Sequence, residues 1–355
     1  MPLTLYVDGP RWRAHQQRVL AAHPRIVPVL KANGYGFGLS RLAEQAAALG
    51  VDTVAVGMYH EIAQVAAGFS EPTGGSVLVM SPWRPFETGA VLAPHVVHTV
   101  GRLSDLAALA ALGSDGPDAA RPRVVLERLT SMRRHGFSAR DLRESAGLLE
   151  RVTVEGVAVH LPLAGGSHLE EVQRLMTDVV AAGLPTRRVF VSHLREAELD
   201  SLRQGYPDYD FRPRIGTELW LGDREAMRVC ATVLDTHPVR RGDVFGYRAR
   251  SAPVAGTIVV VSGGTSHGIA LEAPTGGSTL RERAVRLAQG GLDAAGLVRS
   301  PYTIGGRLRM FAEPPHMQVS MLFLSHGTPV PPVGDEVAVR MRLTTAGFDR
   351  TVVSG

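Results

Sequence analysis

The chain has 355 residues, of which 45% are hydrophobic and 20% are charged. This composition is typical of a globular protein, and the length exceeds that of one ordinary core, so we expect two domains. The net charge of +4 is spread mostly over arginines, without a basic block or interleaved aromatic residues, which argues against a nucleic-acid partner.

Cysteine content and hydropathy set further limits. Cys230 is the only cysteine, which excludes an internal disulfide framework and a cysteine-rich metal site, and we expect no bound metal. No apolar run reaches ~18 residues, and the first residues lack the basic and apolar segments of a signal peptide. We therefore expect a cytoplasmic protein that does not span a membrane.

Short apolar runs alternate with helical patterns as far as about residue 220. We expect strands at residues 26–30, 51–56, 77–80, 96–100, 123–129, 152–160, 188–192 and 211–215. We expect helices near residues 10–24, 40–49, 59–67, 85–92, 104–112, 138–150, 168–182 and 195–203, with Ser40 and Ser138 as N-caps. Sustained alternation predicts a parallel sheet, and eight strands favour its closure into a (β/α)8 TIM-type barrel.

The pattern changes after about residue 225. Short strands bounded by glycine and proline turns are expected at residues 254–261, 268–271, 302–310, 317–324 and 336–343, and only residues 280–289 indicate a helix. The predicted fold is therefore α/β, with an N-terminal barrel at residues 1–224 and a mostly β domain at residues 225–355.

One lysine lies where such a barrel would carry its chemistry. The apolar run at residues 26–30 ends at Lys31, the only lysine in the chain, and glycines follow at positions 34, 36 and 38. TIM-type barrels keep their active sites at the carboxyl ends of the strands. Burial there lowers the pKa of a lysine and makes its amine nucleophilic, as Schiff-base chemistry requires. We expect Lys31 to be such an amine; the alternative is a surface lysine beside a glycine turn.

The stretch at residues 31–38, KANGYGFG, resembles the KANAYGHG motif of the alanine racemase family. The resemblance implies that Lys31 holds pyridoxal 5'-phosphate (PLP) as an internal aldimine and acts as one base, and that Tyr35 reaches the phosphate. The order of barrel and β domain also resembles this family along nearly the whole chain. It differs from the single-barrel PLP-binding relatives, which end after the barrel.

Two further segments carry the same resemblance. Residues 212–220 look like the family's RPGIALYG segment or its RIG variant. This implies that Arg214 faces the pyridine nitrogen and keeps it unprotonated, because a fixed cation opposes a second one. Gly216 and Thr217 would bind the phosphate, and Arg212 lies close enough to compete for the role of Arg214. His160, at a predicted strand end, would stack on the cofactor ring, unless it is simply paired locally.

The remaining barrel candidates follow two other strands. Residues 130–137 are similar to the family's TGMxRxG segment, which implies that Arg134 reaches the cofactor's phenolic oxygen and the substrate carboxylate. Arg133 is the alternative if the register is shifted by one residue. The family's second phosphate-binding strand carries asparagine and serine, whereas this chain offers Ser192, His193 and Arg195 as candidates.

The β domain departs from the family at one decisive position. Residues 316–321 line up with the family's CMDQxM strand, so the backbone of Met317 would bind the substrate carboxylate. Where the family has GYADG, with a tyrosine that the partner subunit supplies as the second base, Thr265 takes the tyrosine's place. A threonine hydroxyl is a poor base, whereas His267, two residues on, carries an imidazole, the side chain most often used for proton transfer. Tyr302 and His316 are further possibilities.

We therefore predict a PLP-dependent amino-acid racemase, with PLP as cofactor, an amino acid as substrate and a homodimer with shared active sites. Lys31 would serve as one base and a β-domain group, Thr265 or His267, as the other. The loss of the tyrosine leaves two alternatives open. One is another reaction on the same scaffold, decarboxylation or one-base proton exchange; the other is a PLP-binding protein without turnover. The sequence does not indicate which amino acid is used.

Overall fold

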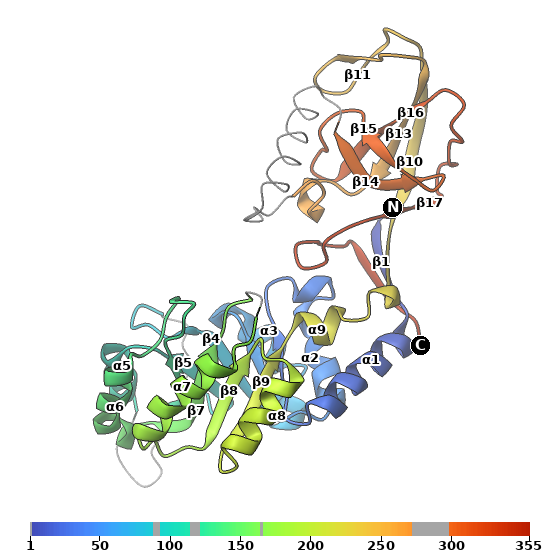
Figure 1. Cartoon of the computed structure of the whole chain (residues 1–355). Helices are drawn as coiled ribbons and strands as arrows, with labels where there is room; N and C mark the ends of the chain where they lie inside the picture. The colour runs from blue at the N-terminus through green and yellow to red at the C-terminus, as the bar shows by residue number, and fades with distance from the viewer. Residues whose placement is uncertain (1, 88–92, 114–120, 164–165, 272–297) are drawn as a thin grey trace. The chain divides into compact units, whose positions relative to one another are not determined.

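The computed structural model describes residues 2–87, 93–113, 121–163, 166–271 and 298–355 (Figure 1). By their internal packing these residues form two compact units. One consists of Ala14–Gly222, and the other combines Met1–Arg13 with Asp223–Gly355. The first strand of the chain therefore groups with the C-terminal part, although its own sequence pattern carries no sign of its partners.

The unit Ala14–Gly222 contains the predicted closed barrel of eight parallel strands. Each strand pairs with the next in sequence, and the last pairs with the first. The strands are β2 (Val27–Leu30), β3 (Thr53–Val56), β4 (Ser76–Pro82), β5 (Val96–Val100), β6 (Arg123–Arg128), β7 (Thr153–His160), β8 (Arg188–Ser192) and β9 (Asp210–Ile215). All eight strands expected before residue 220 are thus confirmed.

The barrel forms because most of these strands are short runs of buried, mainly β-branched residues. Alternate side chains point inward, and they meet in one apolar cluster built from Val27, Val29, Ala55, Leu78, Val97, Val125, Ala158 and Phe190. This packed layer closes the middle of the barrel. Polar side chains that point inward are therefore separated into two groups, one at each end of the strands.

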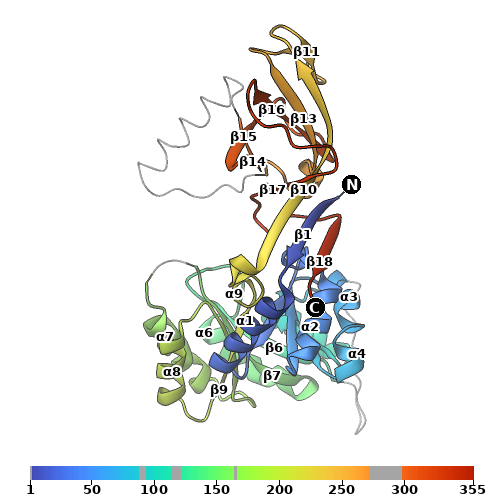
Figure 2. The same ribbon diagram turned by 90° about the vertical axis from the view of Figure 1, so that its right-hand side faces the viewer.

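Helices lie on the outer side of the barrel (Figures 1 and 2). In α7 the buried residues Val172, Leu175, Met176 and Val179 follow the spacing of one helix face. The helices are α1 (Gly9–Ala22), α2 (Leu39–Ala48), α3 (Ile62–Ala66), α4 (Ser70–Thr73), α5 (Leu103–Ala111), α6 (Ala139–Glu144), α7 (Leu169–Ala181), α8 (Glu196–Gly205) and α9 (Thr217–Leu221). Short 3-10 turns are η1 (Gly34–Gly36), η2 (Tyr59–Glu61), η3 (Ser145–Arg151), η4 (Arg224–Ala226) and η5 (Thr265–His267).

One of the two predicted N-caps is confirmed. The Ser138 hydroxyl accepts the backbone N–H of Asp141 at 3.1 Å, and the Asp141 carboxylate accepts in return. Ser40 was the wrong choice, because α2 begins at Leu39 with Gly38 as its N-cap. Gly38 has a φ of 86°, a conformation that glycine adopts without strain, so the chain turns into the helix earlier than a serine cap would require.

The second unit is a mostly β structure, as predicted. Its sheet runs in the order β13-β16-β15-β14-β17-β10-β1-β18, and β10 also pairs with β13. The strands are β1 (Leu3–Val7), β10 (Met227–Val239), β13 (Gly256–Ser262), β14 (Arg299–Ile304), β15 (Arg307–Phe311), β16 (Val319–Ser325), β17 (Glu336–Val339) and β18 (Arg350–Val353). The short strands β11 (Val244–Phe245) and β12 (Arg250–Ser251) pair separately. Figure 2 shows β1 beside β10 and β18.

Several expectations for this unit were wrong in detail. Residues 302–310 contain two strands, β14 and β15, because Gly305 and Gly306 take φ values of 60° and 73° and form a tight turn. Residues 268–271 follow η5 as a turn, with Gly268 at a φ of 86°, and do not form a strand. The helix expected at 280–289 lies outside the described residues, as does most of the one expected at 85–92; residues 85–87 are not helical. No described helix combines the length and the apolar character needed to cross a membrane.

Candidate active site at the carboxyl end of the barrel

Lys31 directly follows β2, at the carboxyl end of the barrel, as predicted. As a residue it is exposed, so the expectation of a buried lysine was wrong in that respect: the side chain starts one residue beyond the buried strand. Protein atoms still crowd its amine. Burial lowers the pKa of Lys31, nearby Arg134 and Arg214 lower it further, and Glu61 acts in the opposite direction. Crowding and the neighbouring cations thus act together to lower the pKa of this amine.

Arg214 and His160 form the buried centre of this end of the barrel. The Arg214 guanidinium is buried, and its Nη2 lies 3.4 Å both from the Val159 carbonyl and from His160 Nδ1. Its Nε has no hydrogen-bond partner among the described residues. Burial lowers the pKa of Arg214, and the charge of Glu127 acts in the opposite direction. A buried donor without an acceptor is costly, so this nitrogen is suited to an acceptor from a ligand.

The protonation state of His160 follows from its neighbours. The hydroxyl of Ser192 lies 3.1 Å from Nδ1, on the side where Arg214 also approaches. A guanidinium can only donate, so Nδ1 must accept and Nε2 carries the proton. Burial first, and then the charge of Arg214, lower the pKa of His160 to about 3. His160 is therefore neutral at physiological pH. Ser192, one of the phosphate candidates, lies against this imidazole, and its contact with a phosphate stays a prediction.

The two arginines of β9 occupy different ends of the barrel. Arg212 pairs with Asp52 and lies over the ring of Phe190 at 5.9 Å. Asp52 immediately precedes β3, so this pair belongs to the amino ends of the strands. Arg214 contacts the carboxyl end of β7 instead. The structure thus resolves the choice between them, and only Arg214 lies on the same side as Lys31.

The two arginines after β6 differ in their effect on the candidate site. The charge of Arg134 lowers the pKa of both Lys31 and His160. Both Arg133 and Arg134 are exposed. Arg134 is therefore the better candidate of the two, and its role in the site stays a prediction.

Tyr35 and Gly216 make a close contact that leaves no room for a side chain. A Cβ added at Gly216 would lie 2.1 Å from the Tyr35 hydroxyl oxygen. Trp220 donates to the Val29 carbonyl at 2.9 Å and so ties α9 to β2. The hydroxyl of Tyr35, the backbone of Gly216 and the exposed start of α9 at Thr217 therefore line one small region, with the donors that a phosphate group needs.

Backbone strain concentrates at this end of the barrel. Of the six described non-glycine residues with positive φ, four follow barrel strands: Ala32 at 53°, Tyr35 at 56°, Arg133 at 51° and His193 at 59°. Each such conformation costs of order 1–3 kcal/mol and persists only where the surroundings enforce it. Strained loops are a common feature of functional sites, and here they flank Lys31, Arg134 and His160.

Two buried acids, Glu61 and Glu127, were not predicted from the sequence. Glu61 accepts backbone N–H groups beside Lys31, and its position three residues into a helical turn is a capping signal. Glu127 lies within β6, 2% exposed, with Oε2 3.2 Å from His135 Nε2. A charged residue inside an apolar strand was the available signal, because buried charges are rare without a partner.

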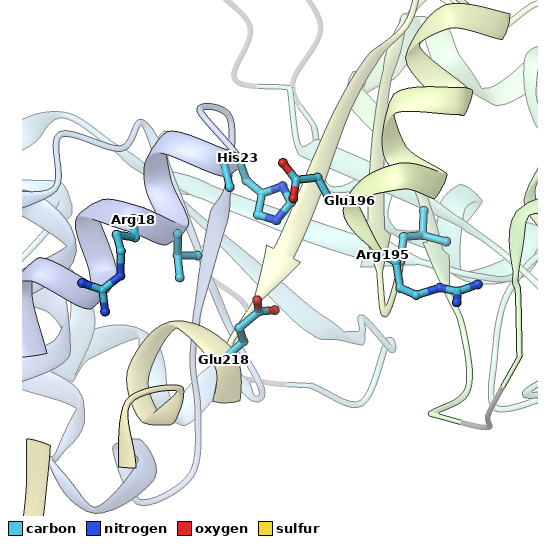
Figure 3. A pocket seen from close by; sticks show the side chains of 8 residues that line it. Arg18, His23, Arg195, Glu196 and Glu218 are labelled. Atoms are coloured by element: carbon cyan, nitrogen blue, oxygen red, sulfur yellow. The ribbon is translucent and has the colours of Figure 1, made fainter. Parts of the chain in front are cut away.

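A separate cavity of about 430 Å³ is lined by Arg18, Val19, Ala22, His23, Leu194, Arg195, Glu196 and Glu218. Figure 3 shows His23 and Glu196 between the two arginines. Of the cofactor candidates, Arg195 alone is among its lining residues. Arg195, one of the phosphate candidates, is also engaged by Glu198 at 3.0 Å. This cavity is therefore not the candidate active site.

In the other unit, the loop that replaces the family's tyrosine segment packs against Met317, just before strand β16. The backbone N–H of Thr265 donates to the His316 carbonyl at 2.8 Å, and a Cβ at Gly264 would lie 2.2 Å from the same oxygen. Thr265 is exposed, and so is Met317, whose carbonyl accepts from Ser266. Thr265, Met317 and His316 therefore share one surface of this unit.

His267 is held inside its own unit. Its Nδ1 accepts the Gly264 N–H at 3.2 Å, and its Nε2 lies 3.0 Å from the Asp349 carboxylate. The residue is 8% exposed, so neither nitrogen is available to a substrate. This geometry argues against His267 as the second base. Tyr302 is also excluded, because it is fully buried and its hydroxyl donates within the unit, to the Gly263 carbonyl at 2.8 Å.

His316 is differently arranged. Its Nε2 lies 2.7 Å from Oε1 of Glu313, which is 2% exposed, while the His316 side chain is 24% exposed. The ring of Tyr247 lies 4.6 Å from the imidazole. A buried carboxylate that holds one nitrogen leaves the other, Nδ1, as a proton acceptor, which is the usual arrangement of a histidine base.

Fold and side chains together define a barrel protein whose candidate active site is centred on a single lysine. The chain belongs to the alanine racemase family, because the model "Alanine racemase, N-terminal domain" matches residues 10–195, just over half of it.

Individual proteins agree with this assignment. The chain is 28% identical over 267 residues to alanine racemase from Nitratidesulfovibrio vulgaris. The matched region covers 68% of this chain and 69% of that protein. Its fold is similar to that of alanine racemase from Bartonella henselae with covalently bound pyridoxal phosphate, with a TM-score of 0.72 and 17% sequence identity. The match covers 99% of this chain and 100% of that chain. The fold is also similar to that of histidine racemase from Leuconostoc mesenteroides, with a TM-score of 0.66 and 18% sequence identity. This match covers 95% of this chain and 87% of that chain.

Proposed function

We propose that the protein is a PLP-dependent amino-acid racemase. The observation that carries this proposal is the buried Arg214 guanidinium, whose Nε has no acceptor in the described part of the chain. It lies beside a neutral His160, at the barrel end that bears the only lysine. A neutral pyridine nitrogen is an acceptor of the required kind. The charge of Arg214 would oppose protonation of that pyridine nitrogen, as it opposes protonation of His160.

The residues present fit the cofactor. Lys31 would bind it covalently through its amine, and Arg214 and His160 would contact its ring. Tyr35, Gly216 and Thr217 would hold the phosphate in the close-fitting region around the Tyr35 hydroxyl. When bound, PLP withdraws electrons from an amino acid and makes its α-proton acidic.

Lys31 and Arg134 would carry out the chain's own part of the reaction on one side of the substrate. Arg134 would bind the substrate carboxylate, since a guanidinium grips a carboxylate through two donors. The lowered pKa of Lys31 increases the fraction of neutral amine at physiological pH, and only the neutral amine takes up a proton. Lys31 Nζ would therefore remove and return the α-proton on its side.

The opposite base would come from the β unit of a second copy in a homodimer, with the Met317 backbone N–H binding the substrate carboxylate. Of the candidates there, His316 is supported best: Glu313 orients it and it is partly exposed. Thr265 lies beside it and carries only a hydroxyl. His267 is buried with both nitrogens engaged. One-base proton exchange remains the second candidate function, because Thr265 replaces the tyrosine of the family motif.

The test is a panel of amino acids incubated with the PLP-loaded protein in deuterated water, read by chiral chromatography and mass spectrometry. Inversion with deuterium at the α-carbon supports racemisation; deuterium with retained configuration supports one-base exchange. Lys31→Ala should abolish both, together with the visible absorbance of the bound cofactor. Absence of cofactor binding by the wild-type chain would refute the proposal.

A further inference from the structure

Glu61 is a buried carboxylate next to Lys31 that the proposed reaction does not use. The residue is 4% exposed and ends the 3-10 turn η2 after strand β3. Its Oε1 accepts the N–H of Ala32 at 2.6 Å. Its Oε2 accepts the N–H groups of Gly57 and Met58 at 2.7 and 3.0 Å. One side chain thus joins the loops that follow β2 and β3.

The hydrogen bond between Ala32 and Glu61 involves a residue with a strained backbone. Ala32 has a φ of 53°, which an alanine adopts only where neighbouring groups hold it. Ala32 is the residue directly after Lys31, so the direction of its peptide sets where the lysine side chain begins. The Glu61 carboxylate is the acceptor that holds this peptide.

Gly57 keeps the carboxylate close to the lysine. A Cβ at Gly57 would lie 3.1 Å from Glu61 Oε2 and 3.3 Å from Lys31 Cβ. Glycine therefore lets the β3 loop pass between the two side chains. Glu61 is also the charge that opposes the effect of Arg134 and Arg214 on the lysine amine.

We propose that Glu61 is a positioning residue for Lys31: it holds the Ala32 peptide and supplies a negative charge beside the lysine. The role of the Lys31 amine in a reaction depends on the proposed function, whereas the position and the pKa of this amine do not. The experiment can therefore be made on the full-length protein without cofactor or substrate.

Because Lys31 is the only lysine, amine-selective labelling reports on it directly. The protein is pulse-labelled by reductive methylation across a pH series, and the peptide containing Lys31 is quantified separately from the N-terminal peptide. Glu61→Gln removes the charge, and Glu61→Asp keeps it on a shorter side chain. Glu71→Gln, an exposed carboxylate on α4, is the matched control.

We expect Lys31 to be labelled with a midpoint below the ordinary lysine pKa of about 10.4. In Glu61→Gln the midpoint should fall by roughly a further half to one pH unit, because an opposing charge has been removed. Glu61→Asp should lie between the two, and Glu71→Gln should match the wild type. An unchanged midpoint in folded Glu61→Gln would overturn the proposal.

A second measurement uses the wild-type protein alone and so does not depend on a variant that folds. Ala32 is exposed, so its amide should exchange quickly with solvent unless Glu61 holds it. Amide exchange followed by NMR should show Ala32 protected by at least about tenfold relative to an unstructured chain. Free exchange of this amide would overturn the proposal. If the protein binds no PLP while Ala32 is protected, the proposed function fails and the positioning role of Glu61 stands.

Discussion

Arg212 and Arg214 project from the same face of β9, two residues apart, but they have opposite surroundings. Arg212 is paired with Asp52 at the amino end of the barrel. Arg214 lies beside His160 at the carboxyl end, and no carboxylate of the described segments is hydrogen-bonded to it. Alternate residues of a strand point to the same side, so the apolar layer of the barrel separates the two guanidinium groups. One arginine serves stability, and the other is available to a ligand.

This contrast predicts opposite effects of two substitutions. Arg212→Gln removes a buried guanidinium that pairs with the exposed Asp52, so it should lower the free energy of unfolding by about 1–3 kcal/mol and leave cofactor absorbance normal in the folded protein. Arg214→Gln should leave the free energy of unfolding within about 1 kcal/mol of the wild type, because it removes a poorly paired buried cation. It should instead change the absorbance of the bound cofactor. Urea unfolding and absorbance spectra measure the two effects; a reversed pattern would contradict the assignment.

The contact between Tyr35 and Gly216 predicts a second result. Gly216→Ala would place a methyl group 2.1 Å from the Tyr35 hydroxyl oxygen, so it should destabilise the protein by about 1–3 kcal/mol and weaken PLP binding. Combining it with Tyr35→Phe removes that oxygen and should restore part of the stability, a coupling that a double-mutant cycle measures. Gly147→Ala is the control, because a Cβ there meets nothing within 4 Å. Strictly additive effects of the two changes would mean that the contact is not formed.

The buried His98 predicts how stability depends on pH. It lies on β5 with Nδ1 3.0 Å from the Tyr59 hydroxyl, and burial lowers its pKa from 6.5 to about 4. Between these two values the unfolded chain binds more protons than the folded chain, so the free energy of unfolding falls as the pH falls. At about 1.4 kcal/mol per pKa unit, full protonation costs roughly 3 kcal/mol.

His98→Gln removes this titration, and the amide oxygen can still accept from Tyr59. Its free energy of unfolding should therefore fall less steeply than that of the wild type between pH 6.5 and 4. His160, whose pKa is also lowered, contributes equally to both proteins and cancels in the comparison. Parallel curves would show that His98 is protonated in the folded protein without cost.

A fourth prediction separates the candidate second bases. His316→Gln should reduce racemisation by about 10²–10⁴-fold, the usual range for a lost proton-transfer group. It should preserve cofactor absorbance and the α-proton exchange that Lys31 performs on its own side. Glu313→Gln should act in the same direction but less strongly, because it only disturbs the orientation of the imidazole. The measurements are chiral chromatography and deuterium incorporation.

His267→Asn is the matched control for this prediction. It breaks the bond to Asp349 and should lower the melting temperature, while the protein that remains folded racemises normally. Normal racemisation by His316→Gln would exclude His316, and loss of racemisation by His267→Asn with an unchanged melting temperature would reinstate His267.

The sequence by itself determined the barrel and the place of Lys31. Runs of buried residues between helical patterns are local signals, and eight such units in a parallel arrangement favour the closed barrel that is observed. The motif at residues 31–38 likewise depends on neighbours in the chain. The grouping of Leu3–Val7 with the β unit was not predictable, because a strand's partners are set by hydrogen bonds to distant segments, here Met227–Val239 and Arg350–Val353.

Only the tertiary structure decided which polar groups act and which are already engaged. Arg212 and Arg214 have the same chemistry and the same strand, and only the layer of side chains between them assigns their roles. His267 has a suitable side chain in a suitable loop, but Asp349, 82 residues away, binds it. Glu61 reaches Ala32 from 29 residues away. Such pairings depend on distances across the fold, and a linear pattern contains no information about them.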